Sequence, residues 1–187
     1  MKIKSLIFAF ALVSLAACKD KEASETATPE APKEVIKENF TVEFDVVSQK
    51  EDNLAVYYTE DNSINFTGES AVWRGVKGAG AEETLYFEFP EAASPTHLRF
   101  DFGINKGDKQ GDIVLKKWRM TFYGNKFEAT GADFFKYFLP NDSIKTEIDQ
   151  AAGTIKFLKD PKGTSTPFYY PNQALVDAVK QVTTINK

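Results

Sequence analysis

The chain has few of the residues on which most enzyme sites depend. Among 187 residues it has one histidine, His97, and one cysteine, Cys18. A single histidine excludes a metal site built from several histidines, and no Gly-x-Ser-x-Gly stretch supplies a serine nucleophile for it to activate. A single cysteine excludes an intramolecular disulfide. We therefore predict no catalytic residue, no bound metal and no cofactor, and we expect His97 to be structural.

Long apolar runs and dense basic runs are also missing. The apolar run at residues 6–15 is interrupted only by Ser14. It is too short for a membrane-spanning helix, which needs about 20 apolar residues. The net charge of −4 and the lack of a basic patch make nucleic acid an unsuitable partner.

The first 18 residues have the layout of an export signal. Two lysines precede the apolar run, and two alanines follow it, directly before Cys18. The stretch Leu15-Ala16-Ala17-Cys18 resembles the lipobox of bacterial lipoproteins. This resemblance implies that residues 1–17 are removed as a signal peptide and that acyl chains, such as palmitate, are attached to Cys18. An ordinary secretory signal with a chance cysteine is the alternative.

Residues 18–37 are expected to be a lipidated cysteine followed by a disordered tether. They are rich in Lys, Glu, Ala, Thr and Pro, so they cannot bury enough apolar surface to offset the entropy of ordering. The charged run Lys19-Asp20-Lys21-Glu22 resembles the lipoprotein export signals of Bacteroidetes, which implies the outer membrane. A solvated linker is the alternative. We expect a lipid-anchored protein of the bacterial cell envelope, with its domain facing the periplasm or the cell surface.

Residues 38–187 are expected to form one domain, large enough to bury a substantial core. Alternating apolar and polar residues predict strands, and turn residues separate them at spacings near ten residues, which is typical of an antiparallel sandwich. The expected strands or extended segments cover residues 40–46, 53–59, 65–67, 71–76, 85–89, 98–102, 113–123, 126–129, 154–158 and 167–171. A short helix or turn is expected at 133–139, and a C-terminal helix at 173–182, capped by Asn172.

The long strand at 113–123 changes parity along its length. Its first apolar residues occupy odd positions, whereas Trp118 and the apolar residues after it occupy even positions. A β-bulge near Lys116-Lys117 would keep both sets on the core side. We therefore predict a bulge at this point.

The segment from Leu98 to Leu115 reads as a strand, a polar loop and a second strand. It resembles a strand pair of jelly-roll domains with carbohydrate-binding-module-like folds. This resemblance implies a mainly β, jelly-roll-like antiparallel sandwich with one or two short helices. It implies a fold more than a function, because sandwiches host many activities.

Two pairs of neighbouring residues combine an aromatic ring with a polar group near expected loops. They are Trp73-Arg74 and Tyr169-Tyr170. Sugars stack their C–H faces on flat rings, and neighbouring polar groups bond their hydroxyls, so both pairs are ligand-binding candidates. Burial in the core is the alternative for each. A second cluster, Asp101, Asp108 and Asp112, offers oxygens suited to calcium, although such residues are also ordinary in solvated turns.

Three functions remain open from the sequence. The leading hypothesis is non-catalytic binding of a glycan or another envelope ligand. The alternative is a structural or accessory subunit that docks on an envelope protein complex, for which a broad apolar patch would argue. The third is a small carboxylate-dependent hydrolase, which needs two facing carboxylates in a cleft.

Overall fold

The computed structural model describes residues 38–104, 109–141, 146–157 and 167–185. The expected signal peptide, Cys18 and the tether lie outside these residues. Residues 35–187 form one compact unit. Its elements, in chain order, are β1 (Thr41–Ser48), β2 (Asp52–Thr59), the 3-10 helix η1 (Gly68–Ser70), β3 (Ala71–Val76), β4 (Glu82–Glu88), β5 (His97–Asp101), β6 (Ile113–Phe122), β7 (Asn125–Thr130), α1 (Phe134–Tyr137), β8 (Phe138–Pro140), β9 (Thr146–Asp149), β10 (Thr154–Phe157), β11 (Phe168–Pro171) and α2 (Gln173–Thr183).

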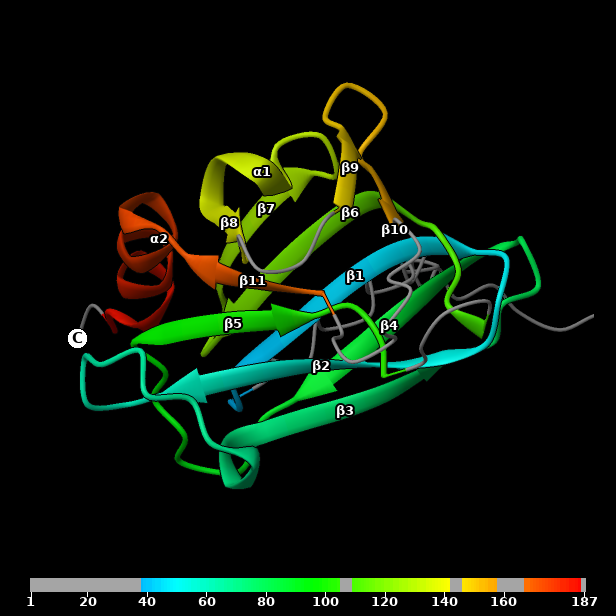
Figure 1. The fold of residues 1–187 in the computed structure, drawn as a ribbon. Coiled ribbons are helices and arrows are strands. Elements are labelled where there is room, and N and C mark those ends of the chain that lie inside the picture. The colour runs from blue at the N-terminus through cyan, green and yellow to red at the C-terminus, as the bar shows by residue number, and fades with distance from the viewer. Residues whose placement is uncertain (1–37, 105–108, 142–145, 158–166, 186–187) are drawn as a thin grey trace, which may run out of the picture. The chain divides into compact units, whose positions relative to one another are not determined.

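Two antiparallel sheets form the sandwich that the strand pattern predicts. The first, which we call sheet A, has the strand order β4-β1-β6-β10-β9, with β7 also paired to β6. The second, sheet B, has the order β3-β2-β5-β11-β8. In Figure 1, β3, β2, β5 and β11 lie in front of β4, β1 and β6, and α2 lies at one end. The mainly β fold class with a C-terminal helix is therefore confirmed.

The core between the sheets is filled largely by aromatic rings. Phe44 of β1 and Phe100 of β5 join the two sheets, with ring centroids 4.2 Å apart. Phe134 of α1 stacks on Phe138 with ring centroids 4.3 Å apart, and it also contacts both Phe44 and Phe100. Burying one such side chain contributes about 1.5–3 kcal/mol, so this ring cluster supplies much of the driving force for folding.

The predicted bulge lies in β6. Asp45 of β1 pairs with Lys117 and Val46 pairs with Leu115, which leaves Lys116 without a partner on β1. Ile113 and Leu115 before this residue, and Trp118, Met120 and Phe122 after it, are all buried. The parity change in the sequence is therefore the signature of this bulge, as predicted.

Helix α2 is held at both ends by asparagine side chains. The Asn172 carboxamide oxygen accepts a hydrogen bond from the Leu175 backbone N–H at 3.2 Å, which confirms the predicted cap. At the other end, Asn125 Nδ2 donates to the carbonyls of Val182 and Thr184, at 3.0 and 2.9 Å. The side chains that these caps hold against the sandwich are Leu175, Ala178, Val179 and Val182.

Two short strands and one loop differ from the sequence-based expectation. The expected strand at 65–67 is wrong, because this segment is a loop that leads into η1. Side chains take the place of strand pairing there: the Ser63 N–H donates to Asp61, and the Asn65 N–H donates to Ser63. Conversely, β8 and β9 were not predicted, since three or four residues are too few to show a period of two.

Among the residues that the structure describes, no helix is both long enough and apolar enough to cross a bilayer.

Candidate functional site

The outer face of sheet A is charged and internally paired. Arg119 on β6 pairs with Glu43 at 3.1 Å and with Asp45 at 2.7 Å, both on the neighbouring β1. The hydrogen bond from Arg119 is the main cause that lowers the pKa of Asp45 below its ordinary value. Lys117 pairs with Glu128 of β7 at 2.8 Å. This is the composition expected of a sheet face that meets water.

The outer face of sheet B is aromatic instead. Strand register places Tyr57 opposite Arg99, and places Trp73 and Asp101 on either side of Ala55, so these residues share one side of the sheet. Phe168 pairs with Asp101 and extends the same side onto β11. We call this surface the aromatic face; its rings are Tyr57, Phe66, Trp73, Phe168 and Tyr170.

The rings of the aromatic face contact one another in two groups. Trp73 lies edge-on to Tyr57, with centroids 6.0 Å apart. Tyr170 lies 5.2 Å from Phe168 and 6.2 Å from Phe66. Phe66 comes from the loop between β2 and η1, so this loop adds a ring to the face. The two groups flank the middle strand of the sheet, β5.

An arginine and an aspartate of β5 occupy the centre of this face. The Arg99 guanidinium donates two hydrogen bonds to the Asp101 carboxylate, each 2.7 Å long. Its central carbon lies 4.2 Å from the centroid of the Tyr57 ring and 4.6 Å from that of Phe168. Exposed fractions of 16% for the Arg99 side chain and 8% for that of Asp101 show that both are largely removed from water.

Burial and pairing act in opposite directions on the ionisation of these two residues. Burial raises the pKa of Asp101, and the hydrogen bonds from Arg99 offset part of this effect. For Arg99, burial acts to lower the pKa, but the hydrogen bond and the charge of Asp101 outweigh it and raise it. Burial also raises the pKa of Tyr57, which therefore stays protonated at neutral pH. The pair adds one positive and one negative charge, and no net charge, to the aromatic face.

The predicted pair Tyr169-Tyr170 is divided between the core and the surface. Tyr170 lies on the aromatic face, but Tyr169 is fully buried, with an exposed fraction of 0%. The Tyr169 ring packs against Phe102 at 5.2 Å and Phe134 at 5.5 Å. The prediction that Tyr169 binds a ligand is therefore corrected: Tyr169 is a core residue, because strand alternation turns it away from the surface.

The predicted pair Trp73-Arg74 is also divided, between the aromatic face and the edge of the sandwich. Trp73 is 40% exposed and lies on the aromatic face. Arg74 lies at the edge of the sandwich, where its Nε donates to the carbonyl of Tyr86 on β4 and its Nη1 donates to the carbonyl of Trp73. Because β3 and β4 are the edge strands of the two sheets, Arg74 links one sheet edge to the other. Its role in the structure is to close this edge.

Comparison with known proteins adds no relative. No family model, no curated protein and no solved structure matches this chain. The chemistry of the aromatic face must therefore be argued from its own residues.

Most residues of the aromatic face were not predicted from the sequence. Arg99 and Asp101 stand at the outward positions of a strand that was correctly predicted, so their alternation with Leu98 and Phe100 was the available signal. Tyr57 and Phe168 become part of the site only through the pairing of β2 and β11 with β5. Sequence periodicity gives the face on which a residue lies but not the neighbouring strand.

The acidic residues considered for calcium have other partners where the structure describes them. Both carboxylate oxygens of Asp101 accept hydrogen bonds from Arg99. Asp112 accepts a hydrogen bond from the Phe157 backbone N–H at 3.3 Å. Asp108 lies outside the described residues. Within those residues, no group of three or more His, Cys, Asp or Glu side chains is placed to hold a metal ion. The His97 ring lies 3.2 Å from the Thr96 hydroxyl.

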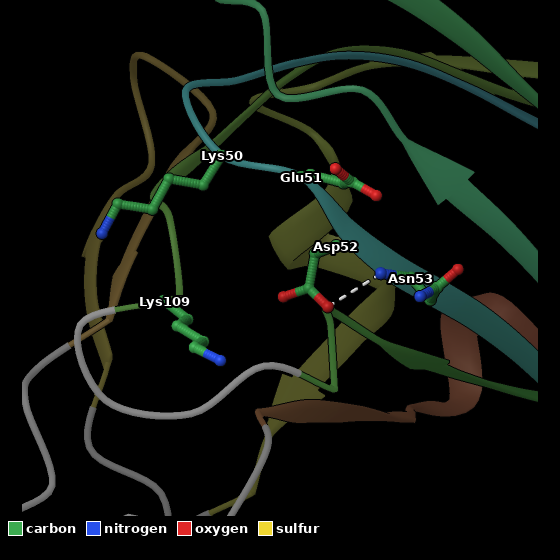
Figure 2. Close-up of a pocket in the computed structure, with 5 residues that line it drawn as sticks. All are labelled: Lys50, Glu51, Asp52, Asn53 and Lys109. Carbon is green, nitrogen blue, oxygen red and sulfur yellow. Dashed lines mark hydrogen bonds between the residues drawn. The ribbon is translucent and has the colours of Figure 1, made fainter.

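An open polar pocket of about 450 Å³ lies at the end of the sandwich, between the β1–β2 turn and residue 109. Figure 2 shows its lining residues, Lys50, Glu51, Asp52, Asn53 and Lys109. The Asp52 carboxylate is buried and accepts hydrogen bonds from the backbone N–H groups of Asn53 and Ile104, at 2.7 and 2.8 Å. Asp52 thus fixes the chain where it leaves β5, and the buried acid of this pocket serves the fold.

Proposed function

We propose that this protein is a lipid-anchored component of the bacterial outer membrane whose sandwich binds a glycan, without catalysis, across the aromatic face. The observation that carries the proposal is the grouping of five rings on the outer face of sheet B, three of which contact the guanidinium of Arg99. An exposed Trp and half-buried tyrosines on an outer face are costly to leave in water, and they suit a ligand that covers them.

A carbohydrate matches the chemistry of this face. Flat rings accept the C–H faces of sugars, and a few polar groups placed among them orient the ligand through its hydroxyls. Together with Leu139 of β8, which lies opposite Tyr170, the aromatic face extends over the five strands of sheet B, beginning at Trp73 on β3. At about 4.8 Å between strands, it spans about 19 Å, which favours an oligosaccharide over a single sugar.

The first experiment is a glycan-array screen of residues 38–187, which contain every strand pairing described above. Trp73→Ala and Tyr170→Ala are tested beside the unchanged domain. Each removes one ring group of the aromatic face, so we expect each to weaken binding to the same glycans by tenfold or more. Tyr123→Ala is the matched control, because Tyr123 is an exposed aromatic residue in the β6–β7 turn, outside the face.

The outcome decides between glycan binding and other roles. Equal losses in all three variants would contradict the proposal, because they would indicate a general effect of removing exposed rings. Circular dichroism of each variant establishes that the fold is intact.

Docking on an envelope protein complex is the second candidate function. The observation that favours it is the exposure of Leu139, at 50%, beside Tyr170 on the aromatic face. A well-folded domain that binds no glycan on the array would support this role, and crosslinking of the anchored protein in intact cells would then identify its partner.

A further inference from the structure

We infer that Arg99 is the residue that recognises the ligand of the aromatic face and that this ligand is an uncharged glycan. The inference rests on the proposed function and adds to it the recognising atoms and the ligand class. It depends on three features: the N–H groups that Arg99 has left after pairing with Asp101, the rings that hold its guanidinium, and the balance of charge around it.

The pairing with Asp101 uses only some of the N–H groups of Arg99. A guanidinium carries five N–H groups, of which one on Nε and one on Nη2 donate to Asp101. Among the described residues, Nη1 donates no hydrogen bond, and 16% of the side chain is exposed. A ligand that covers this face must offer acceptors to these donors, because a buried N–H without a partner costs about 1–3 kcal/mol.

Three rings and the Asp101 carboxylate already contact other parts of the Arg99 guanidinium. Tyr57 and Phe168 lie on the guanidinium at 4.2 and 4.6 Å, and Phe66 lies 5.8 Å away. The Asp101 carboxylate occupies the edge formed by Nε and Nη2. A ligand therefore meets Arg99 at the Nη1 edge while its apolar faces contact the surrounding rings. A sugar has this combination of acceptor oxygens and C–H faces.

Charge balance selects against acidic sugars. The groups that act on the charge of Arg99 are Asp101 on its own strand, Tyr57 on β2 and Tyr170 on β11. Asp101 is the formal anion among them and already balances Arg99. An approaching carboxylate or sulfate would lose hydration beside the largely buried Asp101, whose negative charge already balances Arg99. A hydroxyl-bearing neutral sugar avoids this cost.

Asp101 is accordingly a positioning residue. Its two hydrogen bonds hold the guanidinium in one orientation between the rings, and its charge cancels the attraction that Arg99 would exert on anions. Replacing Asp101 with Asn keeps the size of the side chain but removes the negative charge. The selectivity of the face should then change toward acidic ligands, whereas a merely structural role would only reduce all binding.

The test compares neutral and acidic hexasaccharides by calorimetry on residues 38–187. The neutral probes are hexamers of glucose, mannose and N-acetylglucosamine, and the acidic probes are hexagalacturonate and a heparin hexasaccharide. We expect a neutral probe to bind at least tenfold more tightly than either acidic probe. Arg99→Met should weaken that binding tenfold or more, because Met keeps apolar contact with the rings but has no donor.

Asp101→Asn supplies a second, independent readout. We expect it to raise affinity for the acidic probes about tenfold, with a dependence on salt that the unchanged domain lacks. Acidic probes bound best by the unchanged domain, or neutral binding unaffected by Arg99→Met, would overturn the inference. If Trp73→Ala loses binding while Arg99→Met keeps it, the inference about Arg99 is overturned but the proposed glycan binding is not. No binding to any probe, by the unchanged domain or by Asp101→Asn, would overturn the proposed function as well.

Discussion

Tyr169 and Tyr170 are neighbours in the chain but meet different surroundings. The Tyr169 ring is enclosed by Phe102, Phe134 and Phe135, whereas the Tyr170 ring faces outward beside Phe66 and Phe168. The side-chain period of a strand is two, so one position decides whether a tyrosine serves the core or the binding face. The consequence is that the two residues should be separable by experiment.

Tyr169→Ala should lower the free energy of unfolding by about 3–5 kcal/mol, because it leaves a cavity among packed rings. Tyr170→Ala should lower it by about 1 kcal/mol, because this ring is only partly buried. Tyr169→Phe should also cost little, since the hydrogen bond that the Tyr169 hydroxyl makes within the described residues, to the Thr146 hydroxyl, is long at 3.4 Å. Urea denaturation of the three variants measures these differences, and equal losses at positions 169 and 170 would refute the assignment.

At the scale of the element, the bulge in β6 depends on two glycines outside that strand. The Gly131 N–H donates to the Lys116 carbonyl, and the Gly153 carbonyl accepts from the Leu115 N–H, each at 2.8 Å. A Cβ atom at Gly131 would lie 1.8 Å from the Leu115 carbonyl oxygen, and one at Gly153 would lie 2.4 Å from the same atom. The extra residue in β6 is thus accommodated by close backbone approach on two sides.

Gly131→Ala should therefore lower the free energy of unfolding by about 3 kcal/mol, because backbone atoms would have to move to admit the methyl group. Gly68→Ala is the matched control, since nothing lies within 4 Å of a Cβ atom at Gly68. It should change stability by less than about 0.5 kcal/mol. Thermal and urea unfolding measure both variants. A Gly131→Ala domain as stable as the control would show that the bulge does not need this approach.

The same element shows what sequence periodicity can and cannot predict. The parity of apolar residues in β6 located the bulge to within one residue, because burial acts on each residue of a strand separately. Gly131 and Gly153 gave no such signal, since their contacts with β6 exist only in the folded chain. The aromatic face shares this property: its members lie on β2, β3, β5, β11 and a loop, and only register brings them together.

At the scale of the whole molecule, the two sheets present different surfaces. Sheet A has outward ion pairs such as Arg119 with Asp45, and sheet B has outward rings around Arg99. Such a difference suits a domain that binds on one side and stays solvated on the other. The proposed lipid anchor would then hold the domain at the membrane while leaving the aromatic face free to meet a ligand.

The anchor is tested at Cys18. Cys18→Ser removes the thiol that the lipobox resemblance assigns to acylation, so we expect loss of palmitate labelling. We also expect the protein to move from the membrane fraction to the soluble fraction of the cell envelope, because an acyl chain contributes about 0.8 kcal/mol per buried methylene. Membrane retention of Cys18→Ser without label would contradict the anchor and favour attachment through a protein partner.

Arg74 bears on how copies of the protein behave beside one another. The edge of β4 offers backbone carbonyls to any strand that approaches, and Arg74 already donates to the one at Tyr86. Molecules attached to one membrane diffuse in two dimensions and collide far more often than the same number free in solution. Under that lateral crowding, an open sheet edge would join neighbours into β-linked chains. With the proposed lipid anchor, the carbonyl that Arg74 occupies from within its own domain would be closed to a strand of a neighbouring copy.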